Sequence, residues 1–158
     1  MNIEMFFIKT DAVSQVSNTV RQHIKSASDV ANQQPDWGLP SSYDVLLAKE
    51  PKRKVAISPA INNWVAGIES KEVIDFALLQ QIAKALRTDV IAVQLSEVSG
   101  CCGYALCSNE KIIEHYFSED DDNPAGTIAE FLKRNNVKTG LVSFREAVQM
   151  RNQGWLIV

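Results

Sequence analysis

The 158-residue chain lacks the features that would place it in a membrane or mark it for export. No stretch approaches the roughly 18 consecutive apolar residues of a membrane-spanning helix. The segment from Met1 to Lys9 includes Glu4 and has neither a basic start nor a small-residue cleavage site, which argues against a signal peptide. We therefore expect a cytoplasmic protein with no membrane partner.

An excess of positive charge is also missing. The chain has 16 Lys and Arg against 19 Asp and Glu, a formal net charge of −3. A general nucleic-acid binder carries the opposite balance, so no nucleic-acid partner is predicted. One basic cluster, Lys52 to Lys54 beside Pro51, is interpreted as a solvated hairpin tip because short charge runs are usually exposed.

Cysteine and histidine are scarce. Cys101, Cys102 and Cys107 are odd in number and lack the spacing of zinc or thioredoxin sites, so neither a disulfide nor a metal site is expected. Only His23 and His115 are available as the base that a cysteine nucleophile needs. His23 falls at the edge of a helical apolar stripe and is interpreted as a boundary residue. A catalytic pair of His115 with one of the adjacent cysteines remains a minor alternative.

Catalytic and cofactor-binding signatures are absent as well. The chain has neither the G-x-S-x-G turn of a serine hydrolase nor a glycine-rich phosphate loop, so no cofactor is predicted. The acidic run from Glu119 to Asp122 does not match an EF-hand calcium loop, because Ala125 and Leu132 stand where two ligands are needed.

What remains is the composition of an ordinary soluble globular protein, with 46% hydrophobic and 22% charged residues. A chain of this length buries roughly 70% of its unfolded surface on folding, so it needs no disulfide or metal for stability. One domain spanning residues 1–158 is expected.

Hydrophobic periodicity predicts the helices. Apolar residues recur at three- and four-residue spacing over Val13–Ala31 and Phe76–Arg87, which is typical of helices with one core-facing side. Two further helices are predicted to begin after Asn123, an N-cap followed by proline, and after Ser143, which forms a capping box with Glu146. The expected buried arc of the second helix consists of Phe76, Leu78, Leu79, Ile82, Ala83 and Leu86.

Short apolar runs bounded by turn residues predict the strands. They are Ile3–Ile8, Tyr43–Ala48, Val55–Ser58, Asn62–Glu69, Val90–Val98, Gly103–Cys107, Lys111–Phe117 and a strand or docked tail at Trp155–Val158. Tyr43–Ala48 and Val55–Ser58 are expected to pair as a hairpin. The order of elements predicts an α+β fold with a mostly antiparallel sheet and about four helices packed on it. It also fits two strand-helix-strand-strand modules.

The loop from Glu97 to Tyr104 is the first place where we look for function. Its two glycines allow unusual backbone angles or the close approach of another group. The alternative interpretation is a β-bulge or wide hairpin turn that happens to contain cysteines. The candidate binding residues in the loop are Glu97, Ser99, Cys101, Cys102 and Tyr104.

The leading hypothesis is a small non-enzymatic protein that binds a basic protein partner through an acidic surface. An immunity-like or antitoxin-like inhibitor of bacterial type has this profile, because carboxylates steer and neutralise a basic active site. The candidate contacts are Asp120, Asp121 and Asp122. The competing interpretation is that these carboxylates only support the helix at Pro124 through its dipole.

Two other classes of function remain open. A small-molecule binding domain would have a pocket between the sheet and the helices, lined by Trp64, Tyr104 and Tyr116. An enzyme would use Glu97 or Glu114 as an acid or base. Two further residues have open roles: His115 remains a candidate binding residue, and Trp37 is either a lid packed on the core, which we favour, or a contact residue.

Overall fold

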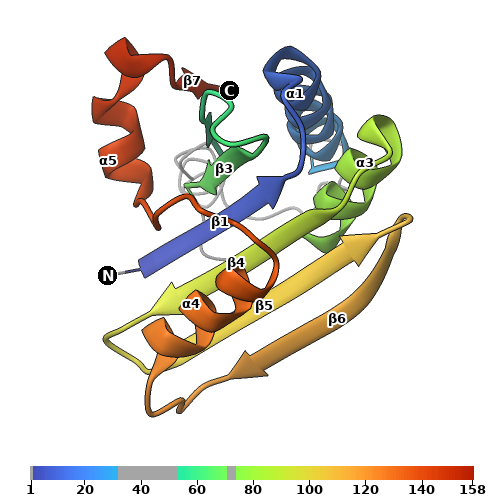
Figure 1. Ribbon diagram of the computed structural model, residues 1–158. Helices are drawn as coiled ribbons and strands as arrows, with labels where there is room; N and C mark the ends of the chain where they lie inside the picture. The colour runs from blue at the N-terminus through green and yellow to red at the C-terminus, as the bar shows by residue number, and fades with distance from the viewer. Residues whose placement is uncertain (1, 32–52, 71–73) are drawn as a thin grey trace, which may run out of the picture.

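The computed structural model describes residues 2–31, 53–70 and 74–158, in which seven strands form one sheet (Figure 1). The strands are β1 Asn2–Ile8, β2 Val55–Ile57, β3 Val65–Glu69, β4 Val90–Ser96, β5 Cys101–Ser108, β6 Lys111–Ser118 and β7 Leu156–Ile157. Their order across the sheet is β6-β5-β4-β1-β3-β2-β7, and every pairing is antiparallel. The predicted α+β fold with an antiparallel sheet is confirmed.

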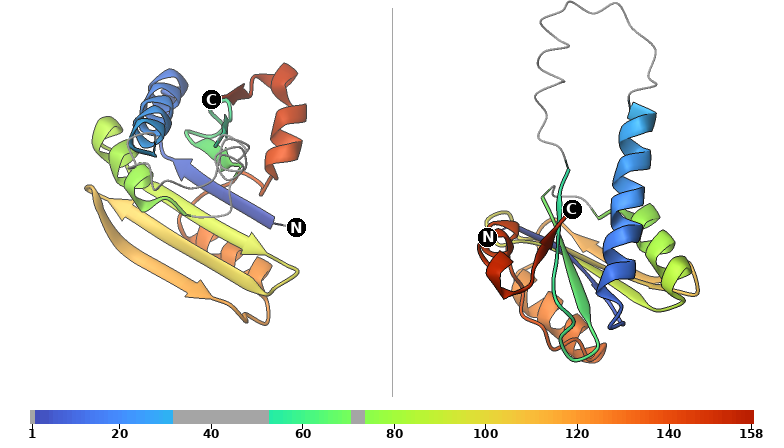
Figure 2. Two further views of the ribbon diagram at one scale, coloured as in Figure 1. Left: turned by 180° about the vertical axis from the view of Figure 1, so that it is seen from behind. Right: turned by 90° about the horizontal axis from the view of Figure 1, so that it is seen from above.

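Helices cover both faces of this sheet, as the right-hand view of Figure 2 shows. Helices α1 (Val13–Ala31) and α3 (Phe76–Leu86) pack on one face, which we call the α1–α3 face. Helices α4 (Pro124–Arg134) and α5 (Phe144–Gln149) pack on the other, the α4–α5 face, and a short 3₁₀ helix (Arg151–Gln153) follows α5.

The central strand β1 is buried on both sides because it lies between these two helix layers. Met5 and Phe7 belong to the core under α4 and α5, whereas Phe6 and Ile8 belong to the core under α1 and α3. Successive side chains of a strand point to opposite faces, so burial on both faces requires a continuous apolar run. β1 has such a run.

The predicted caps are present, and most of the predicted helical arc is buried. Asn123 accepts a hydrogen bond from the Gly126 N–H (3.2 Å), and Ser143 forms the capping box with Glu146. In α3 the buried residues are Leu78, Leu79, Ile82 and Ala83. The prediction was wrong for Phe76, which is 45% exposed because it stands in the first turn, directly after the N-cap residue.

The predicted strand Asn62–Glu69 starts later than expected. Asn62 and Asn63 have positive φ angles of 51° and 63°, and the backbones of Ile61 and Trp64 exchange hydrogen bonds across them. Asparagine tolerates this left-handed conformation, so the pair forms a two-residue hairpin turn between β2 and β3. The predicted partner Tyr43–Ala48 lies outside the described residues; β2 pairs with β3 and β7.

Candidate binding surface

The strand β6 forms one edge of the sheet and pairs with β5 alone among the described strands (Figure 1). Its side chains at Ile113 and Phe117 are 61% and 58% exposed, and His115 between them is exposed as well. The ring of Phe117 lies against Gly103 of β5, where an added Cβ would be 3.1 Å from Phe117 Cδ2. A long edge strand with exposed apolar side chains is a template for pairing with another chain.

An acidic loop adjoins this edge. Glu119, Asp120 and Asp122 directly follow β6 and are exposed, while Asp121 between them is partly buried. The apolar edge strand and the acidic loop together make up what we call the β6 surface: Ile113, His115, Phe117, Glu119, Asp120 and Asp122.

Asp121 has a different role from its neighbours. Its Oδ2 accepts hydrogen bonds from the Thr127 hydroxyl (2.9 Å), the Tyr116 hydroxyl (3.1 Å) and the Cys102 thiol (3.4 Å). Its Oδ1 accepts from the Asn123 N–H (2.7 Å). The Asn123 N–H first, and then the Thr127 hydroxyl, hold the pKa of Asp121 below its usual value. Asp121 therefore ties β5 and β6 to the start of α4.

This geometry predicts that the acidic run divides into one structural and several surface carboxylates. Asp121→Asn is expected to lower the melting temperature, because an amide nitrogen cannot accept the hydrogen bonds that Asp121 Oδ2 accepts. Asp122→Asn is the matched control, since Asp122 is exposed, and its melting temperature should stay close to that of the wild type. Thermal melts that fall equally for both variants would contradict this division.

The loop predicted from Glu97 to Tyr104 is shorter in the structure. Only Glu97 to Gly100 form the turn between β4 and β5, and Glu97 and Ser99 are exposed there. Cys101, Cys102 and Tyr104 belong to β5: the prediction of a loop was wrong for the two cysteines, and for Tyr104 the predicted strand Gly103–Cys107 was correct. Their pairing with Ser96, Leu95 and Val93 of β4 extends the hairpin up to the turn.

A catalytic pair of Cys102 and His115 does not form. Cys102 is in the core of the α4–α5 face, whereas His115 pairs with Ala105, which is in the core of the α1–α3 face. Burial first, and then the hydrogen bond to Asp121, raise the pKa of the Cys102 thiol to about 11. The thiol is therefore protonated at neutral pH and a poor nucleophile. The structure records Cys101, Cys102 and Cys107 as free.

The three aromatic residues predicted to line one pocket are separated. Tyr104 stacks on Tyr116 with ring centroids 5.3 Å apart and on Phe131 of α4 at 3.9 Å. Trp64 is buried just before β3, and both β4 and β1 lie between β3 and β5 in the sheet. Phe131 of α4 therefore covers Tyr104, whereas Tyr116 is 37% exposed.

Of the two residues proposed as the acid or base of an enzyme, Glu114 has a structural partner. Glu114 forms an ion pair with Arg134 of α4 at 2.5 Å, and Glu97 stands apart from it in the exposed β4–β5 turn. Among the described residues, no group of three or more His, Cys, Asp or Glu is placed to hold a metal ion.

A partly buried ionic cluster, which we did not predict from the sequence, joins β3, α3 and α1 to the residue Arg53 just before β2. Arg53 contacts both carboxylate oxygens of Glu69, through Nε (3.0 Å) and Nη2 (2.5 Å), and Asp75 Oδ2 through Nη1 (2.7 Å). His23 Nε2 lies 2.9 Å from the same Asp75 oxygen and its Nδ1 lies 2.8 Å from Gln81. The interpretation of Arg53 as part of a solvated tip was therefore wrong, whereas His23 is a boundary residue as predicted. Lys52 lies outside the described residues.

The charges in this cluster offset the cost of burial. Burial alone lowers the pKa of Arg53, but hydrogen bonds and Coulomb attraction from Glu69 and Asp75 raise it above its usual value. Burial alone raises the pKa of Asp75, but the Leu78 N–H, Arg53 and His23 together lower it. The sequence indicates the local position of only two members of the cluster: Asp75 is a good N-cap residue before α3, and Glu69 ends a buried strand.

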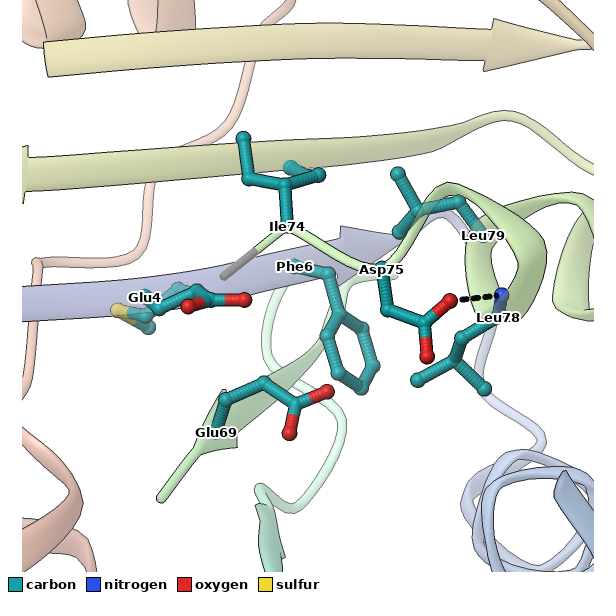
Figure 3. Close-up of a pocket in the computed structure, with 9 residues that line it drawn as sticks. Glu4, Phe6, Glu69, Ile74, Asp75, Leu78 and Leu79 are labelled. Carbon is teal, nitrogen blue, oxygen red and sulfur yellow. Dashed lines mark hydrogen bonds between the residues drawn. The ribbon is translucent and has the colours of Figure 1, made fainter. Parts of the chain in front are cut away.

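The acidic side chains border a small cavity. Figure 3 shows Glu4, Glu69 and Asp75 reaching towards the Phe6 ring from β1, β3 and the start of α3, with the Leu78 N–H bonded to Asp75. The cavity has a volume of about 10 Å³, which is room for about one water molecule. The cluster therefore has no space for a substrate and acts as a structural support.

Comparisons with protein-family models, curated protein sequences and solved structures found no match for this chain. Among the described helices, none combines the length and the apolar character needed to cross a membrane.

Proposed function

We propose that this chain is a protein-binding domain whose β6 surface docks on a basic partner protein. The observation that carries the proposal is the edge strand β6, with Ile113 and Phe117 more than half exposed. Solvent contact at such residues is unfavourable, and burial against a partner removes it. An inhibitor of immunity or antitoxin type is the class of protein that fits this surface.

The edge strand supports binding by strand addition. Among the described strands only β5 pairs with β6, so a partner segment can gain main-chain hydrogen bonds along the outer edge of β6, while side-chain contacts on the exposed face supply specificity. His115 and Phe117 share one face of β6, opposite Ala105 and Gly103 of β5, because side chains alternate along a strand. The register of the two strands shifts between Leu106 and Cys107, so Ile113 stands at an unpaired position next to this face. Phe117 packs over Gly103, so this ring is already positioned before a partner arrives.

The acidic loop supports a partner with a basic surface. Glu119, Asp120 and Asp122 are exposed at the end of β6, where they would surround the contact on one side. Charges at the rim of an interface mainly raise the association rate and select against partners of the same sign. Because Asp121 is occupied by structural hydrogen bonds, it is excluded from the proposed contact.

The variant Ile113→Glu tests the proposal. The tagged wild-type chain and the variant are used to capture proteins from an extract of the source cells, and the captured amounts are compared by mass spectrometry. We expect a basic protein whose capture falls at least about tenfold with Ile113→Glu, since a buried charge without a partner destabilises an interface.

Leu156→Glu is the matched control, because Leu156 is 43% exposed on β7, the opposite edge of the sheet. It should capture the same protein as the wild type. With that protein purified, the double variant Asp120→Asn/Asp122→Asn should slow association and flatten its salt dependence. Equal capture by both Glu variants, or an acidic partner, would refute the proposal.

A further inference from the structure

A second cavity, far larger than the one beside Glu69, lies on the α4–α5 face. Its volume is about 360 Å³, within the range of roughly 300 to 1,000 Å³ that is usual for small-molecule sites. Strands β1 and β3 contribute Met5 and Ala66, which alternate with residues of the other core. The other lining residues come from the β2–β3 connection and the C-terminal part of the chain: Ser58, Pro59, Ile61, Thr139, Gly140, Val142, Met150, Gln153 and Trp155.

The lining determines which charge a ligand can have. None of these residues is acidic or basic, and most of them are apolar. An ion that entered the cavity would lose its hydration without gaining a counter-charge, which is strongly unfavourable. A neutral and mostly apolar molecule meets no such penalty.

One polar atom of the lining has unused hydrogen-bonding capacity. The Thr139 hydroxyl oxygen is buried and has no hydrogen-bond partner in the part of the chain that the structure describes. The Ser58 hydroxyl, in contrast, accepts from the Ala66 N–H (2.8 Å) and donates to the Pro59 carbonyl (2.7 Å). A buried polar atom without a partner is costly, and a polar group on a ligand can remove that cost.

We propose that this cavity binds a small, neutral, mostly apolar molecule with one hydrogen-bonding group that pairs with the Thr139 hydroxyl. The cavity and the β6 surface have no residue in common, so this binding is independent of the proposed protein partner. The cavity also differs from the pocket expected from the sequence, because Trp64, Tyr104 and Tyr116 are not among its lining residues.

The test is a fluorescence titration of the full chain with two dyes that share one ring system. N-phenyl-1-naphthylamine is neutral with a single N–H group, and 8-anilinonaphthalene-1-sulfonate adds a sulfonate. We expect saturable binding of the neutral dye to one site, and at least about tenfold weaker binding of the sulfonate because the cavity offers no counter-charge.

Substitutions locate the bound dye. Ile61→Glu places a carboxylate in the lining at a residue that is 43% exposed, and it should weaken binding of the neutral dye at least about tenfold. Val98→Glu is the matched control: Val98 is 89% exposed in the β4–β5 turn and does not line the cavity, so the affinity should not change. Thr139→Val should weaken binding severalfold by removing the hydroxyl at constant shape, and Thr139→Ser should retain the affinity.

Several results would overturn the proposal. Absence of saturable binding by the neutral dye would do so, including the case in which another part of the chain already fills the cavity. Equal affinity for the two dyes would do so as well, as would equal effects of Ile61→Glu and Val98→Glu. Because Thr139→Val keeps the side-chain shape, it remains informative if Ile61→Glu does not fold.

Discussion

Arg53→Met is expected to lower the free energy of unfolding by about 3 to 5 kcal/mol, the usual loss when one partner of a buried ion pair is removed. The Glu69 side chain is only 3% exposed, so without Arg53 its charge would remain buried without its present counter-ion. Chemical denaturation at neutral pH measures the change. Lys54→Met is the matched control, because Lys54 is the adjacent basic residue and is exposed, and its effect should stay within about 0.5 kcal/mol.

The double variant Arg53→Met/Glu69→Met shows whether the instability of Arg53→Met comes from the uncompensated charge of Glu69 or from lost packing. Replacing both partners with apolar side chains is often neutral or stabilising, so the double variant should recover most of the loss. If the double variant is as unstable as Arg53→Met, the buried charge is not the cause.

The same cluster makes the free energy of unfolding depend on pH in the acidic range. The folded chain holds the pKa of Asp75 below its unfolded value of about 4, so its contribution is present above that pH. The contribution is lost as the pH falls through the lowered pKa in the folded state. Because Arg53 is one cause of the lowered pKa, Arg53→Met should reduce the part of the acid sensitivity that comes from Asp75.

Leu79→Ala is expected to cost about 2 to 5 kcal/mol in the free energy of unfolding. Leu79 is fully buried in the core between α3 and the sheet, together with Ile82 and Val90. Truncation removes apolar contacts and leaves a cavity that a close-packed core refills only in part. The change is measured as a shift of the denaturation midpoint at unchanged slope.

Leu156→Ala is the matched control for this substitution. Leu156 is 43% exposed in β7, so the same truncation should cost well under 1 kcal/mol, as surface changes usually do. A loss well below 1 kcal/mol for Leu79→Ala as well would mean that the buried face of α3 is wrongly assigned.

The sequence by itself determined the elements that depend on neighbours along the chain. The three- and four-residue spacing in α1 and α3 and the caps at Asn123 and Ser143 could be identified because these interactions join residues within one turn. Trp64, Ala66 and Ile68 pack into one core and Val65 into the other, which is equally local, because a strand sends successive side chains to opposite faces.

Tertiary structure decided the order of the strands and therefore the candidate sites. Periodicity does not indicate which strand lies at an edge. The exposure of Ile113 and Phe117 on β6 could therefore be identified only from the strand order of the folded sheet. For the same reason the Glu97–Tyr104 segment could be taken for a loop, although its last four residues belong to β5 and pair with β4.

The ionic cluster and the large cavity depend even more on long-range packing. Arg53 meets Glu69 and Asp75, which are 16 and 22 residues away, because β2 lies beside β3 and α3 begins just beyond it. The Thr139 hydroxyl belongs to the cavity lining because the C-terminal part of the chain folds back to place β7 beside β2. A contact between distant segments is set by the whole packed core, and a local pattern carries no information about it.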